Sequence, residues 1–335
     1  MMTQHEITAP VDLLDRHGRL LHPGYATRMQ WQYDPRKIKA HPFALKEWDF
    51  FQVQLGDWVL QFTLGHVSYA WNAAVTLLHP ADGQRESFSI MRPFSLPMMG
   101  NTPESEHIVS AGGKGWHMSA DYLPGVVVLT ARTDDGYMDV SLLLERPTGN
   151  DKMVIATPFE KPNQFYLNSK EHFPSVSGTA RIGNTEVEAI PGNTALLDWG
   201  RGVWPFRQDW YWGCGSAECN GKQFGFNIGW GFGNLSHATE NLLFLDGKAI
   251  KLGRLETDME ETALNRPWHF RDENGIFDMV MTPVYDNHTT TKLLWVDNSC
   301  HQVFGSFSGT VKLPDGGEFR FENLDAFVEH AHNRW

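Results

Sequence analysis

The sequence predicts an all-β protein of antiparallel strands. The main observation is a series of dipeptides that favour positive φ in a tight reversal, each between segments rich in β-branched or aromatic residues: Asp82-Gly83, Asp135-Gly136, Gly183-Asn184, Asn220-Gly221, Asp246-Gly247, Asn274-Gly275 and Asp315-Gly316. The second observation is that helical periodicity is almost absent. The turns are unevenly spaced and no motif recurs at a fixed period, which argues against a propeller or a solenoid.

Composition indicates an acidic globular protein with a real core. Hydrophobic residues make up 41% of the 335 residues and charged residues 20%, with 13 tryptophans. A net charge of −12 disfavours binding to nucleic acid or to anionic membranes. No apolar run approaches the roughly 20 residues of a membrane-spanning helix. The first residues lack a secretory signal, and Cys214, Cys219 and Cys300 form no CxxC motif, so we expect a cytoplasmic protein with free thiols.

The first part of the chain predicts few regular elements. Residues 1–40 contain three prolines and are expected to form an extended N-terminal segment, with a short helical turn over 34–40. Proline-rich stretches predict long loops at 92–103 and at 158–162.

One hairpin can be predicted in register. If Asn220-Gly221 forms a two-residue loop, Trp212 faces Gly229 and Gly213 faces Ile228, so bulky side chains oppose small ones. The strand that follows places aromatic and aliphatic residues on one face and mainly glycine on the other. Two interpretations stay open: the glycines serve tight packing alone, or they leave room for a ligand under Trp210 and Trp212.

The end of the chain predicts a short helix. Over residues 323–333, Leu324, Phe327, Val328 and Ala331 follow the i, i+3, i+4, i+7 spacing of one helical face. We expect this helix to close the end of the last β domain.

The densest cluster of candidate functional residues begins at Leu196. It combines Asp198 with several tryptophans and with Arg201 and Arg207. Indole walls would desolvate the Asp198 carboxyl, raise its pKa and make it a proton donor. An ion pair with either arginine would instead make it a structural anion. Both interpretations stay open.

Two further clusters carry carboxylates. Glu47 and Asp49 share one face of a predicted strand, which requires a cation, a proton or a polar ligand between them. An arginine elsewhere in the chain is the favoured partner. His237 and Glu240 follow the glycine-rich strand and could reach the same cavity as Asp198. We expect no metal, because a histidine and a carboxylate without a third ligand are weak evidence for a site.

Searches for cofactor and hydrolase motifs are negative. The glycines from Gly225 to Gly233 do not follow the GxGxxG spacing and precede no helix. GxxxxGK[ST], HExxH and GxSxG are absent. No cofactor is expected.

Several segments closely resemble an uncharacterised bacterial family known as a domain of unknown function. The strongest are Ala195-Leu-Leu-Asp-Trp-Gly-Arg-Gly-Val-Trp204, Trp210-Tyr-Trp-Gly213, Phe224-Gly-Phe-Asn-Ile-Gly-Trp-Gly231 and Ala238-Thr-Glu-Asn241. More distantly, the chain is similar to the two-domain lipocalin-like superfamily of carotenoid 1,2-hydratase and tocopherol cyclase. In that superfamily an Asp-x-x-Trp motif near the domain junction contributes acidic chemistry. Asp198 takes the matching position here, although its tryptophan follows directly.

The resemblance implies two consecutive antiparallel lipocalin-like β-barrels, at residues 41–192 and 193–335, after the N-terminal segment 1–40. It also implies an acid-assisted hydratase, cyclase or isomerase that acts on an apolar unsaturated molecule in an aromatic-lined cavity near the junction. Asp198 is the expected acid, and Glu240 or Glu47 would orient water or act as base. The residues expected to contact the ligand are Trp199, Arg201, Trp204, Arg207, Trp210, Trp212, Asn227, Trp230 and His237.

Two other functions remain open. A lipocalin-type barrel can bind or carry a lipid-like molecule without any acid. Paired carboxylates with tryptophan platforms also suit a carbohydrate-active enzyme. In each case the expected partner is a small molecule, apolar or sugar-like, and no oligomeric state is predicted.

Overall fold

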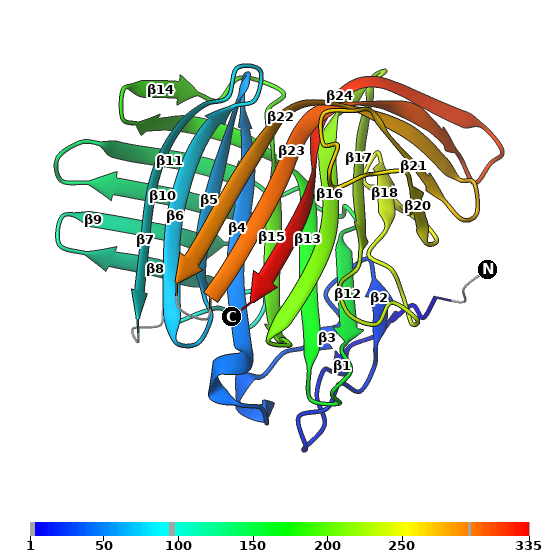
Figure 1. Ribbon diagram of the computed structural model, residues 1–335, viewed down its shortest axis with the longest axis horizontal. Coiled ribbons are helices and arrows are strands. Elements are labelled where there is room, and N and C mark those ends of the chain that lie inside the picture. The colour runs from blue at the N-terminus through cyan, green and yellow to red at the C-terminus, as the bar shows by residue number, and fades with distance from the viewer. Residues whose placement is uncertain (1–3, 94–97, 294–295, 335) are drawn as a thin grey trace.

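The protein folds into two curled antiparallel β-sheets, as two lipocalin-like barrels require (Figure 1). The computed structural model describes residues 4–93, 98–293 and 296–334. Helical structure in this part of the chain is limited to the 3₁₀ turns η1 (Pro35–Lys37) and η2 (Pro42–Ala44). The predicted turn over 34–40 therefore corresponds to η1. The loop predicted at 92–103 lies partly outside the described residues, at 94–97, and the loop at 158–162 follows the last residue of a strand.

The N-terminal segment contributes three short strands. β1 (Val11–Asp12) and β3 (Trp31–Gln32) form a two-stranded parallel ribbon, and β2 (Gly24–Ala26) joins the edge of the first sheet through β12. The segment is therefore bonded to the first sheet and is not a free tail.

The first sheet has 13 strands, with the main order β7-β6-β5-β4-β15-β13-β11-β10-β9-β8. In addition to β2, its strands are β4 (Leu45–Leu55), β5 (Trp58–His66), β6 (Ala70–His79), β7 (Gln84–Pro93), β8 (His107–Gly113), β9 (Trp116–Leu123), β10 (Val126–Thr133), β11 (Met138–Glu145), β12 (Met153–Pro158), β13 (Phe165–Ile182), β14 (Thr185–Glu188) and β15 (Thr194–Val203). The division of the chain at residues 40 and 192 stays a prediction; hydrogen bonding places β15 in the first sheet.

The second sheet has nine strands in the order β19-β18-β17-β16-β24-β23-β22-β21-β20. They are β16 (Arg207–Cys219), β17 (Lys222–Trp230), β18 (Leu242–Leu245), β19 (Lys248–Lys251), β20 (Leu255–Thr257), β21 (Trp268–Asp272), β22 (Phe277–Leu293), β23 (Val296–Lys312) and β24 (Glu318–Arg334). The predicted hairpin register is confirmed, because Trp212 pairs with Gly229 and Gly213 with Ile228.

The predicted C-terminal helix is wrong: residues 323–333 belong to strand β24, which pairs with β16 and β23. The physical reason is that both faces of β24 are covered. Ala326 and Val328 point into the core of the second barrel, whereas Phe327 points toward the first sheet. Apolar residues at consecutive positions then imitate helical spacing.

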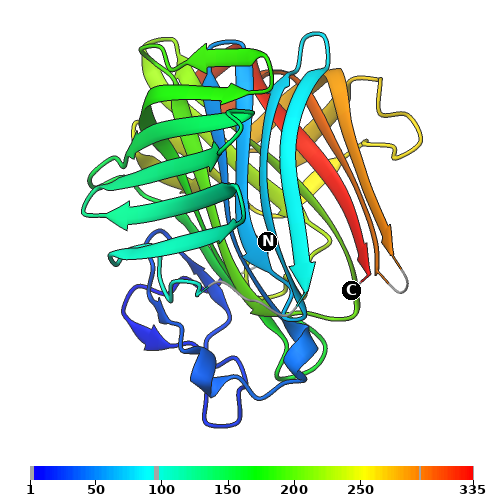
Figure 2. The same cartoon turned by 90° about the vertical axis from the view of Figure 1, so that its left-hand side faces the viewer.

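Each barrel has its own apolar core, and the two sheets meet through their outer faces. The first core lies inside the curl of β4–β15, and the second inside β16–β24. Between them, Phe50 on β4 packs edge-on against Trp212 on β16, with ring centroids 6.3 Å apart. Figures 1 and 2 show the long strands of the second sheet lying across the first. The contact between the sheets thus forms a separate region with its own side chains.

Candidate functional site

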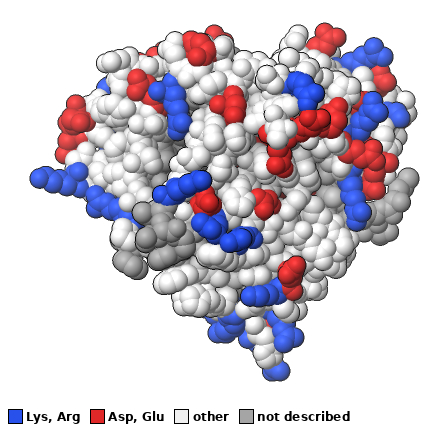
Figure 3. All heavy atoms as spheres, in the orientation of Figure 1, with Lys and Arg blue, Asp and Glu red and all other residues white. Residues whose placement is uncertain are grey.

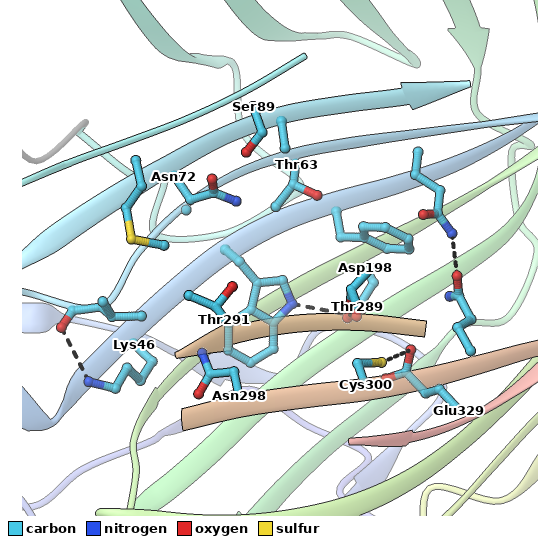
Figure 4. Close-up of a pocket in the computed structure, with 18 of the residues that line it drawn as sticks. Lys46, Thr63, Asn72, Ser89, Asp198, Thr289, Thr291, Asn298, Cys300 and Glu329 are labelled. Atoms are coloured by element: carbon cyan, nitrogen blue, oxygen red, sulfur yellow. Dashed lines mark hydrogen bonds between the residues drawn. The ribbon is translucent and has the colours of Figure 1, made fainter. Parts of the chain in front are cut away.

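A cavity of about 810 Å³ lies between the outer faces of the two sheets (Figure 4). The first sheet contributes to its lining from β4, β5, β6, β7, β13 and β15, and the second sheet from β16, β22, β23 and β24. Strand alternation sets this lining, because every second side chain of a strand turns toward the other sheet. Each barrel interior holds an apolar core, whereas the space between the sheets is lined by polar, acidic and aromatic side chains and is the candidate binding site.

Aromatic rings form one wall of the cavity. Trp48 stacks on Tyr166 at a centroid distance of 5.6 Å, and the edge of Trp204 meets Trp48 at 4.9 Å. Trp210 and Phe232 continue this wall from the second sheet. Gly200 makes the arrangement possible, since a Cβ there would lie 2.1 Å from the Trp48 indole.

Asp198 projects from β15 into this aromatic region and is 6% exposed. Its Oδ1 accepts a hydrogen bond from the Asn168 amide at 2.5 Å, and its Oδ2 accepts one from the Trp48 indole at 3.4 Å. Burial raises the pKa of the Asp198 carboxyl above its ordinary value, although the Lys170 ammonium acts in the opposite direction. Asp198 therefore keeps its proton to a higher pH than an exposed aspartate does.

Glu240 lies on the second-sheet side, held by a buried ion pair. Lys170 donates to its Oε2 at 2.7 Å and also lies 4.6 Å from the centroid of the Trp212 ring. Asn227 donates to the Glu240 backbone carbonyl at 2.7 Å and accepts from the Trp212 indole at 2.8 Å. Burial opposes the charge of Lys170, but the Glu240 and Asp198 carboxylates outweigh it and raise the pKa of Lys170. The lysine is therefore a fixed cation among the acids of the site.

Gly229 leaves room for Glu240 rather than for a ligand. A Cβ at this position would lie 2.2 Å from the Glu240 Oε1 atom. The glycine that faces Trp212 is thus explained by the Glu240 carboxylate, which packs against β17 at this position.

Glu329, on β24, is a third buried carboxyl in the lining. Its Oε1 accepts a hydrogen bond from the Trp210 indole at 2.8 Å, and the Cys300 thiol lies 4.0 Å from its Oε2. Burial raises the pKa of Glu329 to about 7, with a further contribution from the Asp198 carboxylate. The site therefore contains one carboxyl, Glu329, that can carry a proton near neutral pH.

Two predicted ligand contacts, Trp199 and Arg201, lie on the opposite face of β15, inside the first barrel. Arg201 is fully buried, pairs with Asp49 at 2.9 Å and with Glu47 at 3.6 Å, and lies 4.2 Å from the Trp199 ring centroid. Positions 199 and 201 alternate with 198, so they cannot share its face. The predicted arginine partner of the Glu47 and Asp49 carboxylates is thus Arg201, and no guanidinium contacts Asp198 within the described chain.

Glu47 reaches the cavity edge, but its carboxylate is fully engaged. It accepts from the Tyr33 hydroxyl at 2.6 Å and bonds to the His66 ring at 2.7 Å. Burial opposes its anion, yet His66 and Arg201 outweigh burial and hold the pKa of Glu47 below its ordinary value. Glu47 therefore serves as a structural anion.

Three other predicted residues lie away from the cavity. Arg207 and His237 are exposed. Trp230 points to the inner face of the second sheet, where it stacks on Tyr211 at 4.8 Å and approaches Phe270. The cavity thus brings together Asp198, Glu240, Trp204, Trp210 and Trp212, with Asn227 behind Glu240.

Sequence reasoning missed several residues of the site: Lys46, Trp48, Tyr166, Asn168, Lys170, Phe232 and Glu329. Lys46 donates to the Phe43 and Val67 carbonyls, and burial lowers its pKa to about 7. Trp48 and Lys46 alternate with Glu47 in the sequence, so strand periodicity could have assigned them to the face opposite Glu47. Lys170 lies in a stretch buried on both faces, which gives no periodic signal.

The described residues give no support for a metal site or for a membrane-spanning helix. No group of three or more His, Cys, Asp or Glu among them is arranged to hold a metal ion. None of the helices in this part of the chain is long and apolar enough to cross a membrane. On the face shown in Figure 3, acidic and basic side chains are interspersed, so this face offers no continuous basic groove for nucleic acid.

The sequence matches the model of a domain of unknown function, DUF2804, over residues 4–335. The chain belongs to this family. The predicted membership of a domain-of-unknown-function family is thus confirmed. A comparison with curated proteins finds no match.

Several solved structures with low sequence identity to this chain are similar to it in fold. CghA with Sch210972 superposes with a TM-score of 0.58 at 11% identity, covering 96% of both chains. Kievitone hydratase from Nectria haematococca gives 0.51 at 10% identity, covering 87% of this chain and 88% of that one. A putative AttH from Nitrosomonas europaea gives 0.53 at 14% identity, covering 89% and 95%. At these identities the likeness is one of fold.

Proposed function

We propose that this DUF2804 protein is an acid-assisted enzyme that protonates an apolar, unsaturated small molecule in the cavity between its sheets. The observation that carries the proposal is Asp198: a buried carboxyl with a raised pKa, in contact with Trp48. Protonation of an alkene needs an acid shielded from water, and the resulting cation is stabilised by aromatic faces.

Each residue of the site has a separate role in the proposed reaction. Asp198 donates its proton to one alkene carbon, and the positive charge develops on the other carbon, facing Trp48, Trp204 and Trp210. Water or an internal hydroxyl then adds to the cation and releases a proton, which leaves a hydratase or cyclase product. Glu240, which is paired with Lys170 at 2.7 Å, is placed to accept that proton.

The structural relatives support this reaction class. One of them is named a hydratase, and CghA was solved with the small molecule Sch210972. Both share the two-sheet fold whose outer faces enclose the cavity in this protein.

Deuterium incorporation tests the proposal without knowledge of the product. The protein is incubated in D₂O with a panel of isoprenoid alkenes, and mass spectrometry measures carbon-bound deuterium in recovered substrate and product. Wild type should incorporate deuterium into at least one alkene, whereas Asp198→Asn should reduce the rate by about 10²–10⁴-fold, as expected for the loss of a general acid. Asp209→Asn, at an exposed position on β16, is the matched control.

Ligand binding separates the enzyme from a non-catalytic carrier. Native mass spectrometry of the purified protein should detect a bound small molecule, and Asp198→Asn should retain it. Binding of an alkene by wild type without deuterium incorporation would favour the carrier.

A further inference from the structure

The cavity continues beyond its aromatic and acidic region into a neutral polar part, which we call the polar wing. It is formed by Thr63, Asn72 and Ser89 on the outer face of the first sheet and by Thr289 and Thr291 on β22. Figure 4 shows these side chains and Asp198 around one continuous space. The wing and the acid thus belong to one binding site with two chemically different parts.

Strand register places the wing residues of the first sheet together. Thr63 on β5 is the partner of Ala74 on β6, and Ala74 is in turn the partner of Ser89 on β7. In the next row, Asn72 is the partner of Gly65. Because the small side chain of Ala74 lies between Thr63 and Ser89, the two hydroxyl groups border the open space of the cavity.

The wing side chains are available for a ligand. Over the described residues, Thr63, Asn72, Ser89, Thr289 and Thr291 form no side-chain hydrogen bond with the protein. The neighbouring polar groups differ in this respect. Gln61 donates to Gln302 at 2.6 Å and Arg85 to Asn287 at 3.3 Å, so two bonds between the sheets fix their spacing on one side of the wing.

We propose that the polar wing binds a neutral, hydroxyl-rich group, such as a glycosyl or polyol unit, attached to the apolar unsaturated part that lies beside Asp198. Threonine, serine and asparagine side chains both donate and accept hydrogen bonds without carrying charge, which matches ligand hydroxyl groups. This inference rests on the proposed function for the position of the apolar part. It defines the substrate class as an amphiphile rather than a hydrocarbon.

A pair of probes that share one alkyl chain tests the inference. Binding of octyl β-D-glucoside, below its micelle concentration, is compared with binding of 1-octanol by calorimetry. Wild type should bind the glucoside about tenfold more tightly or better. The double variant Thr63→Val and Thr289→Val should weaken glucoside binding by about 5- to 150-fold, since each of the two lost hydrogen bonds costs about 0.5–1.5 kcal/mol, and should leave octanol binding unchanged.

Thr179→Val, at an exposed position on β13, is the control and should bind both probes like wild type. Equal affinity of wild type for the two probes would overturn the inference, as would a double variant that loses both probes to the same degree. If the glucoside preference is found but no alkene takes up deuterium, the proposed reaction fails while the wing stands. Deuterium uptake without a glucoside preference would instead overturn the wing and leave the proposed reaction in place.

Discussion

Asp198 on β15 lies directly opposite Lys170 on β13, yet the lysine bonds to Glu240, in the segment between β17 and β18, rather than to its cross-strand neighbour. Lys170 therefore faces three buried carboxyls: Asp198, Glu240 and Glu329. Burial disfavours a net negative charge in such a place, so protons must be held by the carboxyls that lack the lysine. The excess of carboxyl groups over the charge of Lys170 makes the site acidic and leads to the following predictions.

Stability should fall as pH rises through the titration of Glu329. Its folded pKa of about 7 lies above the ordinary glutamate value of 4.5, so the folded state binds more protons than the unfolded state between these limits. The loss of stability is complete above pH 7. Glu329→Gln should remove this loss and stabilise the protein at pH 8 by up to about 3 kcal/mol, with little effect at pH 4.

Urea unfolding at pH 4, 6 and 8 measures this difference. Glu322→Gln, at an exposed position on the same strand, is the control and should leave the pH dependence unchanged. A parallel pH dependence in Glu329→Gln and wild type would show that Glu329 ionises normally.

Removal of Lys170 should be costly unless its partner is neutralised too. Lys170→Met leaves the Glu240 anion buried without a counter-charge and should lower the free energy of unfolding by about 3–5 kcal/mol. The double variant Lys170→Met and Glu240→Gln should recover much of that loss. Chemical denaturation of the single and double variants gives the coupling energy, and additive losses would contradict a direct pair.

Gly229→Ala should displace the Glu240 carboxylate. The added methyl group would lie 2.2 Å from its Oε1 atom, so we expect a loss of about 1–3 kcal/mol in the free energy of unfolding. Gly112→Ala is the control, because its Cβ would meet no atom closer than 3.3 Å at an exposed position. A crystal structure of the Gly229→Ala variant with Glu240 still bonded to Lys170 would refute the steric explanation.

The Arg201→Met variant should unfold more readily than wild type, although Arg201 lies outside the cavity. Its loss leaves Glu47 and Asp49 without their buried cation, at an expected cost of about 3–5 kcal/mol. Arg132→Met removes an exposed pair with Asp139 and should cost less than about 1 kcal/mol. Thermal melting compares the two variants. Similar losses of stability would show that the buried ion pair contributes no more to stability than the exposed pair.

The sequence predicted the fold class because tight turns and strict alternation are local signals. The register of the β16–β17 hairpin follows from Asn220-Gly221 alone, and it is correct at Trp212 and Gly229. The C-terminal helix failed because β24 is covered on both faces. Burial by distant segments is not encoded in local spacing.

The sequence predicted the candidate site in part, and one error in that prediction was avoidable. Asp198 and Trp199 are neighbours in a strand, so period-two alternation separates them, as it did for the residues after Asn220-Gly221. By contrast, Lys170 and Glu329 enter the site through pairing between strands far apart in the sequence. Only the fold brings them beside Asp198.

The position of the cavity outside both barrels also bears on how such proteins diversify. Residues that shape the space are on the outer faces of sheets whose inner faces carry the two main cores. Exchanging a wing threonine for another side chain alters what the protein accepts while leaving either barrel core packed as before. The residues that select the ligand and the residues that stabilise the fold therefore lie on opposite faces of the same strands. Substitutions on the outer faces can change ligand selectivity without loss of folding.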